Sequence, residues 1–140
     1  MTELQLHENN KNVCNQIVLS VDLQEVKVRY LCVSKTQGGL GWSDERADVA
    51  IRNYRIWLYL VKNYLNTDLP PSKDIDEVWH CHMLNTEKYI DDCNRIFGFY
   101  LHHDPYFGLG DNADRLRVAY QSTKELFYKC FSIDIDKGHF

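Results

Sequence analysis

Apolar side chains recur every three or four residues along most of this chain, and this spacing predicts helices. The clearest example lies between Ser43 and Leu65. Its apolar stripe consists of Ala47, Ala50, Ile51, Tyr54, Trp57, Leu58, Val61 and Tyr64. The Ser43 hydroxyl can cap the first turn, and the Pro70–Pro71 pair prevents the helix from continuing far. We therefore expect a long helix here, with its stripe in the core.

Four further helices are predicted from similar patterns. Their expected ranges are Ser20 to Lys35, Lys73 to Leu84, Asn85 to about Phe97, and about Ala113 to Phe131. The first should stop before the Gly38–Gly39 pair, and Gly98 suits the position that follows a helix. The predicted fold is therefore all-α, a single compact domain of about five helices over residues 20–131. Residues 1–19 are expected to form an arm or a short extended segment, and residues 132–140 a tail.

Composition narrows the class of protein. The 140 residues are 44% hydrophobic and 26% charged, which suits one globular domain with its own core. A net charge of −4 argues against a nucleic-acid-binding protein, which normally needs a basic face. The chain shows neither a secretion signal nor an apolar run long enough to cross a bilayer. Its five cysteines form an odd set without a CxxC pair, so we expect reduced thiols in a cytoplasmic protein.

The candidate chemistry is concentrated between Asp74 and Gly108, which hold four of the six histidines. Residues two apart on an intact helix point about 200° from each other, so His80 and His82 should not share one ion. Asp76 lies one turn before His80 and can orient its ring for a metal, as carboxylates often do for ligating histidines. An ordinary ion pair between helical neighbours explains the same spacing equally well.

Cys93 and the His102–His103 pair complete the candidate set. Imidazole and thiolate donors suit zinc or another transition metal, so the residues alone offer three or four candidate ligands: His80 or His82, Cys93, and His102 or His103, with Asp76 behind His80. The alternatives stay open: Cys93 can be an inert buried thiol, and the histidine pair can be exposed to solvent.

A longer pattern runs through the same stretch, reading D-x-x-W-H-x-H-x-L, then Y-x-x-D-C, then F-G-x-x-L-x-H. It is formed by Asp76, Trp79, His80, His82, Leu84, Tyr89, Asp92, Cys93, Phe97, Gly98, Leu101 and His103. The pattern resembles the signature of the glycine-rich domain-containing protein-like family of plants and bacteria, and the resemblance extends from Leu23 to about Phe131. It implies a short, bacterial-type member made of the helical domain alone, and it implies no particular catalytic activity. Because the pattern includes His103 and not His102, the predicted metal ligands are His80, His82, Cys93 and His103, with Asp76 as an orienting group.

Three functions are compatible with these residues. The first is a small metal-binding helical protein. The second is a metal-free module that contacts another protein as an adaptor, inhibitor or regulatory subunit. The third is a hydrolase that uses either a metal-bound water or Cys93 as a nucleophile with His103 as its base. The identity of any protein partner is not encoded in these patterns.

Overall fold

The computed structural model describes Thr2, Gln16 and residues 20–104 and 113–137, and in these residues it contains helices and no strand. The predicted all-α fold is confirmed. The elements are α2 (Gln24–Val26), the π-helix η1 (Lys27–Leu31), the 3-10 helix η2 (Lys35–Gln37), α3 (Asp44–Asn63), α4 (Lys73–Leu84), α5 (Thr86–Ile96) and α6 (Ala113–Phe131). Most of the predicted arm, residues 1–19, lies outside the described residues.

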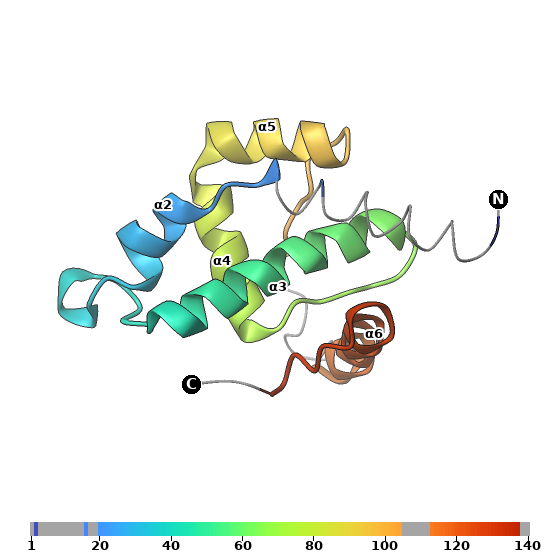
Figure 1. Ribbon diagram of the computed structural model, residues 1–140. Coiled ribbons are helices and arrows are strands. Elements are labelled where there is room, and N and C mark those ends of the chain that lie inside the picture. Colours follow the sequence, from blue (N-terminus) through green and yellow to red (C-terminus); the bar gives the residue numbers. More distant parts are fainter. Residues whose placement is uncertain (1, 3–15, 17–19, 105–112, 138–140) are drawn as a thin grey trace.

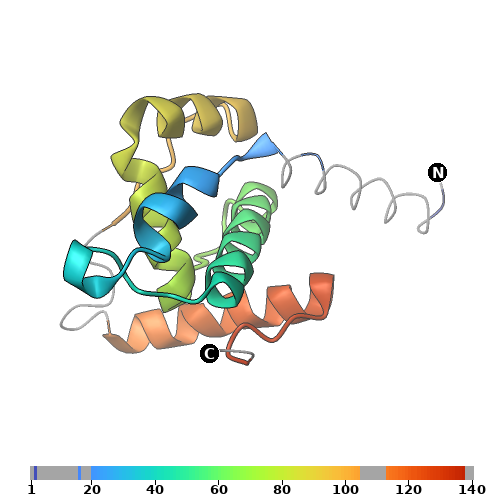
Figure 2. The same cartoon turned by 60° about the vertical axis from the view of Figure 1, so that its left-hand side comes forward.

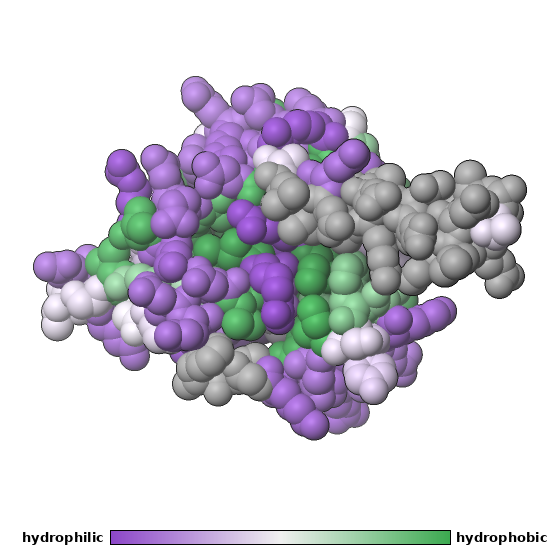
Figure 3. All heavy atoms as spheres, viewed as in Figure 1, coloured by the Kyte–Doolittle hydropathy of each residue, from purple (hydrophilic) through white to green (hydrophobic). Residues whose placement is uncertain are grey.

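Helix α3 crosses the centre of the molecule, with α5 above it, α6 below it and α4 passing behind it (Figure 1). It begins where expected, because the Ser43 hydroxyl accepts a hydrogen bond from the Arg46 amide at 3.2 Å. It ends at Asn63, two residues before the predicted Leu65. Most of the predicted stripe is buried, including Tyr54 and Trp57. In Figure 3, which shows the molecule from the same side, the hydrophobic residues gather around the middle of the view, and a few hydrophilic residues lie between them.

Helices α4 and α5 also follow the sequence pattern. The Ser72 hydroxyl accepts from the Ile75 amide and starts α4, which ends at Leu84 as predicted. Asn85 breaks the helix with a non-helical backbone, and α5 begins directly after it. Gly98 then takes a positive φ of 78°, which a residue with a Cβ rarely adopts, and the chain leaves the helix. These two helices carry most of the candidate chemistry.

The first predicted helix is wrong in its extent. Instead of one helix from Ser20 to Lys35, the chain runs without regular structure over residues 21–23 and then forms α2 and η1. Val21 and Leu23 are both buried, and a helix would turn side chains two residues apart to opposite faces. The Asp22 carboxylate accepts a hydrogen bond from the Gln24 amide at 3.0 Å, so the helical turn begins after Leu23.

Helix α6 closes the opposite side of the molecule, as Figures 1 and 2 both show. It spans the predicted residues and buries Thr123 and Phe127. The Thr123 hydroxyl donates a hydrogen bond to the Pro70 carbonyl at 2.8 Å, which ties α6 to the segment before α4. The described part of the predicted tail, residues 132–137, packs against the domain through the buried side chain of Ile135.

Candidate metal centre

Helix α4 separates the two histidines that the sequence places two residues apart. Its twelve residues form a regular helix, so His80 and His82 point in different directions, as the geometry requires. The side chain of His80 is 54% exposed, whereas His82 is only 2% exposed. One histidine therefore faces solvent and the other faces the core.

His80 belongs to a group that we call the exposed cluster: Asp76, His80 and His103. Each of these residues offers one ligand atom, and these atoms all lie within 4.8 Å of one another. The Nε2 of His103 lies 2.8 Å from Asp76 Oδ1 and 3.1 Å from His80 Nε2, and His80 Nε2 lies 3.6 Å from Asp76 Oδ2. No other group of three histidine, cysteine or acidic side chains in the described part of the chain comes this close.

These separations suit a bound ion. Zinc bonds of about 2.0–2.1 Å in a tetrahedral arrangement place neighbouring donor atoms about 3.3 Å apart, and the observed distances lie on both sides of that value. Two imidazoles and a carboxylate form a donor set that zinc and iron(II) both accept. Because a carboxylate only accepts hydrogen bonds, His103 Nε2 carries a proton toward Asp76 whenever no ion is bound.

Trp79 and Tyr89 bring His103 to the cluster from the segment after α5. The His103 ring stacks on Trp79, with ring centroids 4.3 Å apart and an interplanar angle of 30°. The Trp79 Nε1 donates to the Tyr89 hydroxyl at 2.9 Å, and that hydroxyl donates to the Leu101 carbonyl at 2.6 Å. A chain of contacts thus links α4, α5 and the backbone two residues before His103.

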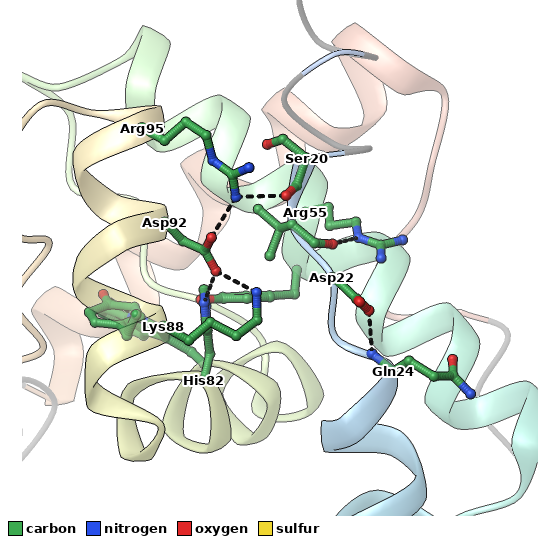
Figure 4. A network of polar contacts seen from close by, with 12 residues as sticks. Ser20, Asp22, Gln24, Arg55, His82, Lys88, Asp92 and Arg95 are labelled. Carbon is green, nitrogen blue, oxygen red and sulfur yellow. Dashed lines mark hydrogen bonds and ion pairs between the residues drawn. The ribbon is translucent and has the colours of Figure 1, made fainter.

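His82 belongs to a second group, which we call the buried network: Tyr54, His82, Lys88, Asp92 and Arg95. Figure 4 shows His82, Lys88 and Arg95 around the Asp92 carboxylate. His82 Nε2 lies 2.8 Å from Asp92 Oδ2, and His82 Nδ1 lies 2.7 Å from the Tyr54 hydroxyl. Burial lowers the pKa of His82, so the ring is neutral near pH 7. The carboxylate can only accept, so Nε2 donates to Asp92 and Nδ1 accepts from Tyr54.

Asp92 is the centre of the buried network. Burial alone would raise the pKa of this carboxyl, but the hydrogen bonds from Lys88 and His82 outweigh that effect and lower it. Lys88 Nζ lies 2.9 Å from Oδ2 and Arg95 Nη2 lies 2.5 Å from Oδ1. The same Arg95 group donates to the Ser20 carbonyl at 2.7 Å, so the network also contacts the first residue of the described segment 20–104.

None of the described cysteines belongs to the exposed cluster. Cys93 is buried on α5, and no hydrogen bond joins it to His103 within the described residues. Burial, followed by the charge of Glu77, raises the pKa of Cys81 to about 11, which keeps this thiol protonated and a poor nucleophile at neutral pH. Cys32, Cys81, Cys93 and Cys130 are all free thiols, and Cys14 lies outside the described residues.

The structure therefore brings together a different set of atoms from the predicted one. His80 and His103 meet as expected, and Asp76 joins them as a potential ligand instead of a group behind them. His82 and Cys93 do not join this cluster, because His82 has both ring nitrogens engaged and Cys93 is covered by the core. The spacing of four residues between Asp76 and His80 was the available signal, since ligands on one helix share a face at that spacing.

The partners of His82 were missed at the sequence level. Lys88 and Asp92 are four residues apart on α5, a spacing typical of a helical ion pair, but nothing local connects them to Tyr54 on α3.

None of the described helices is long and apolar enough to cross a membrane.

Comparison with known proteins finds similarity to part of two much longer chains. Glycine-rich domain-containing protein 2 of Arabidopsis thaliana is 34% identical over 86 residues, which are 59% of this chain and 11% of the relative. Glycine-rich domain-containing protein 1 of the same plant is 35% identical over 93 residues, 64% of this chain and again 11% of the relative. These matches confirm the resemblance seen in the motif. No protein-family model matches the chain, and no solved structure does.

Proposed function

We propose that this chain, which resembles the glycine-rich domain-containing proteins, binds one divalent transition-metal ion through Asp76, His80 and His103. Zinc is the ion that we expect first. The observation that supports this proposal is the convergence of three donor atoms within 4.8 Å from α4 and from the segment after α5. A helix and a separate loop each contribute ligands, so the site exists only in the folded chain.

The surroundings of the cluster also favour an ion. Asp76 is the one carboxylate in it, and it faces two imidazole rings whose Nε2 atoms point toward each other at 3.1 Å. Without a cation, the two ring nitrogens face each other and the carboxylate at hydrogen-bond distances. A divalent ion would be ligated by all three groups at once, and its charge would be balanced in part by Asp76.

Three protein ligands leave room for a further ligand. His80 is half exposed, so water can reach the ion from solvent. An ion held in this way supplies Lewis-acid chemistry and lowers the pKa of a bound water, which is the basis of the hydrolase alternative. The thiol alternative is less well supported, because Cys93 is buried and His103 is engaged with Asp76 and His80.

Metal titration tests the proposal directly. Protein purified without a histidine tag and stripped with a chelator should bind zinc with one-to-one stoichiometry in calorimetry. His80→Ala and His103→Ala should each abolish stoichiometric binding. His102→Ala is the matched control, since His102 lies in the same segment but outside the cluster, and it should bind as the wild type does. Equal zinc affinities for the wild type and His80→Ala would contradict the proposed metal site.

A second candidate function is contact with another protein without any ion. The specific observation in its favour is the exposure of two large apolar side chains on α6, Val118 at 70% and Tyr128 at 67%. The relatives are also much longer than the segment that they share with this chain. Affinity capture with wild type and with Val118→Asp should then recover different sets of proteins. Identical sets of captured proteins would show that Val118 does not take part in binding another protein.

A further inference from the structure

A hollow of about 440 Å³ opens beside two members of the exposed cluster, Asp76 and His103. Its volume falls within the roughly 300–1,000 Å³ typical of small-molecule sites. The walls come from the second half of α3, the segment before α4, one face of α4, the segment after α5 and one residue of α6, Leu116. The hollow is therefore formed by the same tertiary contacts that assemble the cluster.

Most of the wall is apolar and held in place by the core. Trp57, Leu69 and Trp79 line it, and all three are buried. The Trp57 Nε1 donates to the Leu69 carbonyl at 2.8 Å, and the Trp79 Nε1 donates to the Tyr89 hydroxyl. Neither indole therefore has an N–H group left for a ligand. This wall offers rigid apolar surface and calls for an apolar group on the ligand.

The lining of the hollow holds one lysine, Lys73, and three aspartates, so an acid at the other end of the ligand is favoured mainly by the ion. Lys73 lies on its rim and has no ion-pair partner in the described part of the chain. Asp68 also lines the hollow, but Arg115 lies 3.6 Å from its carboxylate. Asp104 adds a negative charge on the rim, and Asp76 would be neutralised in part by the ion. The first turn of α4 borders the hollow as well, and the N-terminal end of a helix favours negative charge.

We propose that the hollow binds a small organic acid with an apolar body, whose acid group occupies the open coordination position of the ion. This inference rests on the proposed metal site. The acid group lies against the ion beside Asp76 and His103, and the apolar body lies against Trp57 and Trp79. Ligands that lack either end bind more weakly, because each end contacts a different part of the site.

Two hydroxamic acids provide suitable probes, because they share one metal-binding group and differ only in its substituent. Benzohydroxamate should bind the zinc-loaded protein at least about tenfold more tightly than acetohydroxamate, since only the phenyl ring covers the apolar wall. Tryptophan fluorescence is a direct readout, because two of the three tryptophans line the hollow. The zinc-free protein should bind benzohydroxamate much more weakly than the zinc-loaded protein.

A pair of variants locates the ring. Leu116→Trp places a larger side chain at the hollow and should reduce benzohydroxamate affinity at least about tenfold while leaving zinc affinity unchanged. Val118→Trp adds the same group to an exposed position of α6 and should change neither affinity. Calorimetric zinc affinity confirms that both variants are folded.

The outcomes separate this inference from the function on which it rests. A wild-type protein that binds no zinc would overturn both. A protein that binds zinc but does not distinguish the two hydroxamates would overturn only the ligand proposal. Undiminished benzohydroxamate binding in a folded Leu116→Trp variant would also overturn it, because the ring would then lie elsewhere.

Discussion

The exposed cluster and the buried network use the same two chemical groups, imidazole and carboxylate, in opposite surroundings. His80 and His82 leave α4 two residues apart, and each has an aspartate within 4 Å. Around His82, every polar atom already has a protein partner: Tyr54 on one ring nitrogen and Asp92 on the other. In the exposed cluster, donor atoms face one another across a small gap that solvent can reach.

The difference shows why a histidine and an aspartate at hydrogen-bond distance do not by themselves make a functional site. A buried pair that is completely satisfied stabilises the fold and has no capacity for a further ligand. A half-exposed pair with a third donor nearby retains that capacity. The arrangement of His80 favours binding an ion, whereas that of His82 favours joining α3, α4 and α5 (Figure 4).

Removing the carboxylate of the buried network should have the largest effect on stability. Asp92→Ala leaves the buried His82 N–H without an acceptor and separates Lys88 and Arg95 from their partner. Leaving this buried donor without its acceptor costs about 1–3 kcal/mol, and the lost ion pairs to the partly exposed Lys88 and Arg95 add little. Urea unfolding followed by circular dichroism measures the loss. Asp91→Ala, an exposed neighbour on α5, should cost less than about 0.5 kcal/mol. Equal costs would show that the network does not stabilise the fold.

The matching change in the exposed cluster should affect metal binding and leave stability almost unchanged. Asp76→Asn removes a charged donor, and we expect zinc affinity to fall by more than about 100-fold. A group that only orients a ligand costs about 10–100-fold, so the size of the loss distinguishes the two roles of Asp76. Calorimetric titration provides the affinities, with Asp91→Asn as the control. A loss within the lower range would place Asp76 behind His80 instead of on the ion.

Tyr89 lies between the two regions and should show an intermediate effect. Tyr89→Phe keeps the ring but leaves the Trp79 N–H and the Leu101 carbonyl without their partner. His103 then loses part of its support, and zinc affinity should fall about tenfold, in the range of other orienting groups. Tyr120→Phe is the matched control, since its hydroxyl contacts Asp136 on the other side of the molecule. Unchanged zinc affinity in Tyr89→Phe would show that His103 is positioned by other contacts.

The smallest expected effect is a pH dependence that arises from His82. Its pKa is lowered from 6.5 in the folded protein, so below pH 6.5 the unfolded chain binds a proton that the folded chain does not. Stability should therefore fall as the pH drops from 6.5 toward the lowered pKa, by at most about 1.4 kcal/mol per pH unit. Asp92 adds a further loss below pH 3.8, because its pKa is also lowered.

A His82→Gln variant isolates this contribution. It should be less stable than the wild type at pH 7, but its stability should depend less on pH between pH 5 and 6.5. Urea unfolding of both proteins at several pH values measures the two slopes. Identical slopes would mean that the other histidines account for the whole effect. The same experiment on His80→Ala provides a comparison with the exposed cluster.

The sequence by itself determined most of the helical boundaries. Ser43, Ser72 and Gly98 act on the backbone within three or four residues of their own positions, so their effect could be predicted locally. The opposite directions of His80 and His82 followed from the same local geometry, because 3.6 residues per turn leave no freedom once the helix forms. The prediction that residues 21–23 are helical was wrong for the converse reason. Packing against the core, and not the local pattern, decided which of their side chains are buried.

Only the tertiary structure decided which ligand atoms meet. His102 and His103 are adjacent in sequence, and the motif that included His103 did not show that its ring would stack on Trp79 and reach Asp76. The segment that carries this residue reaches Asp76 because Tyr89 hydrogen-bonds to the Leu101 carbonyl, a contact between residues twelve apart. His82 is engaged by Tyr54, twenty-eight residues away on α3. Such contacts depend on how whole helices pack, and helical spacing carries no information about distances between one helix and another.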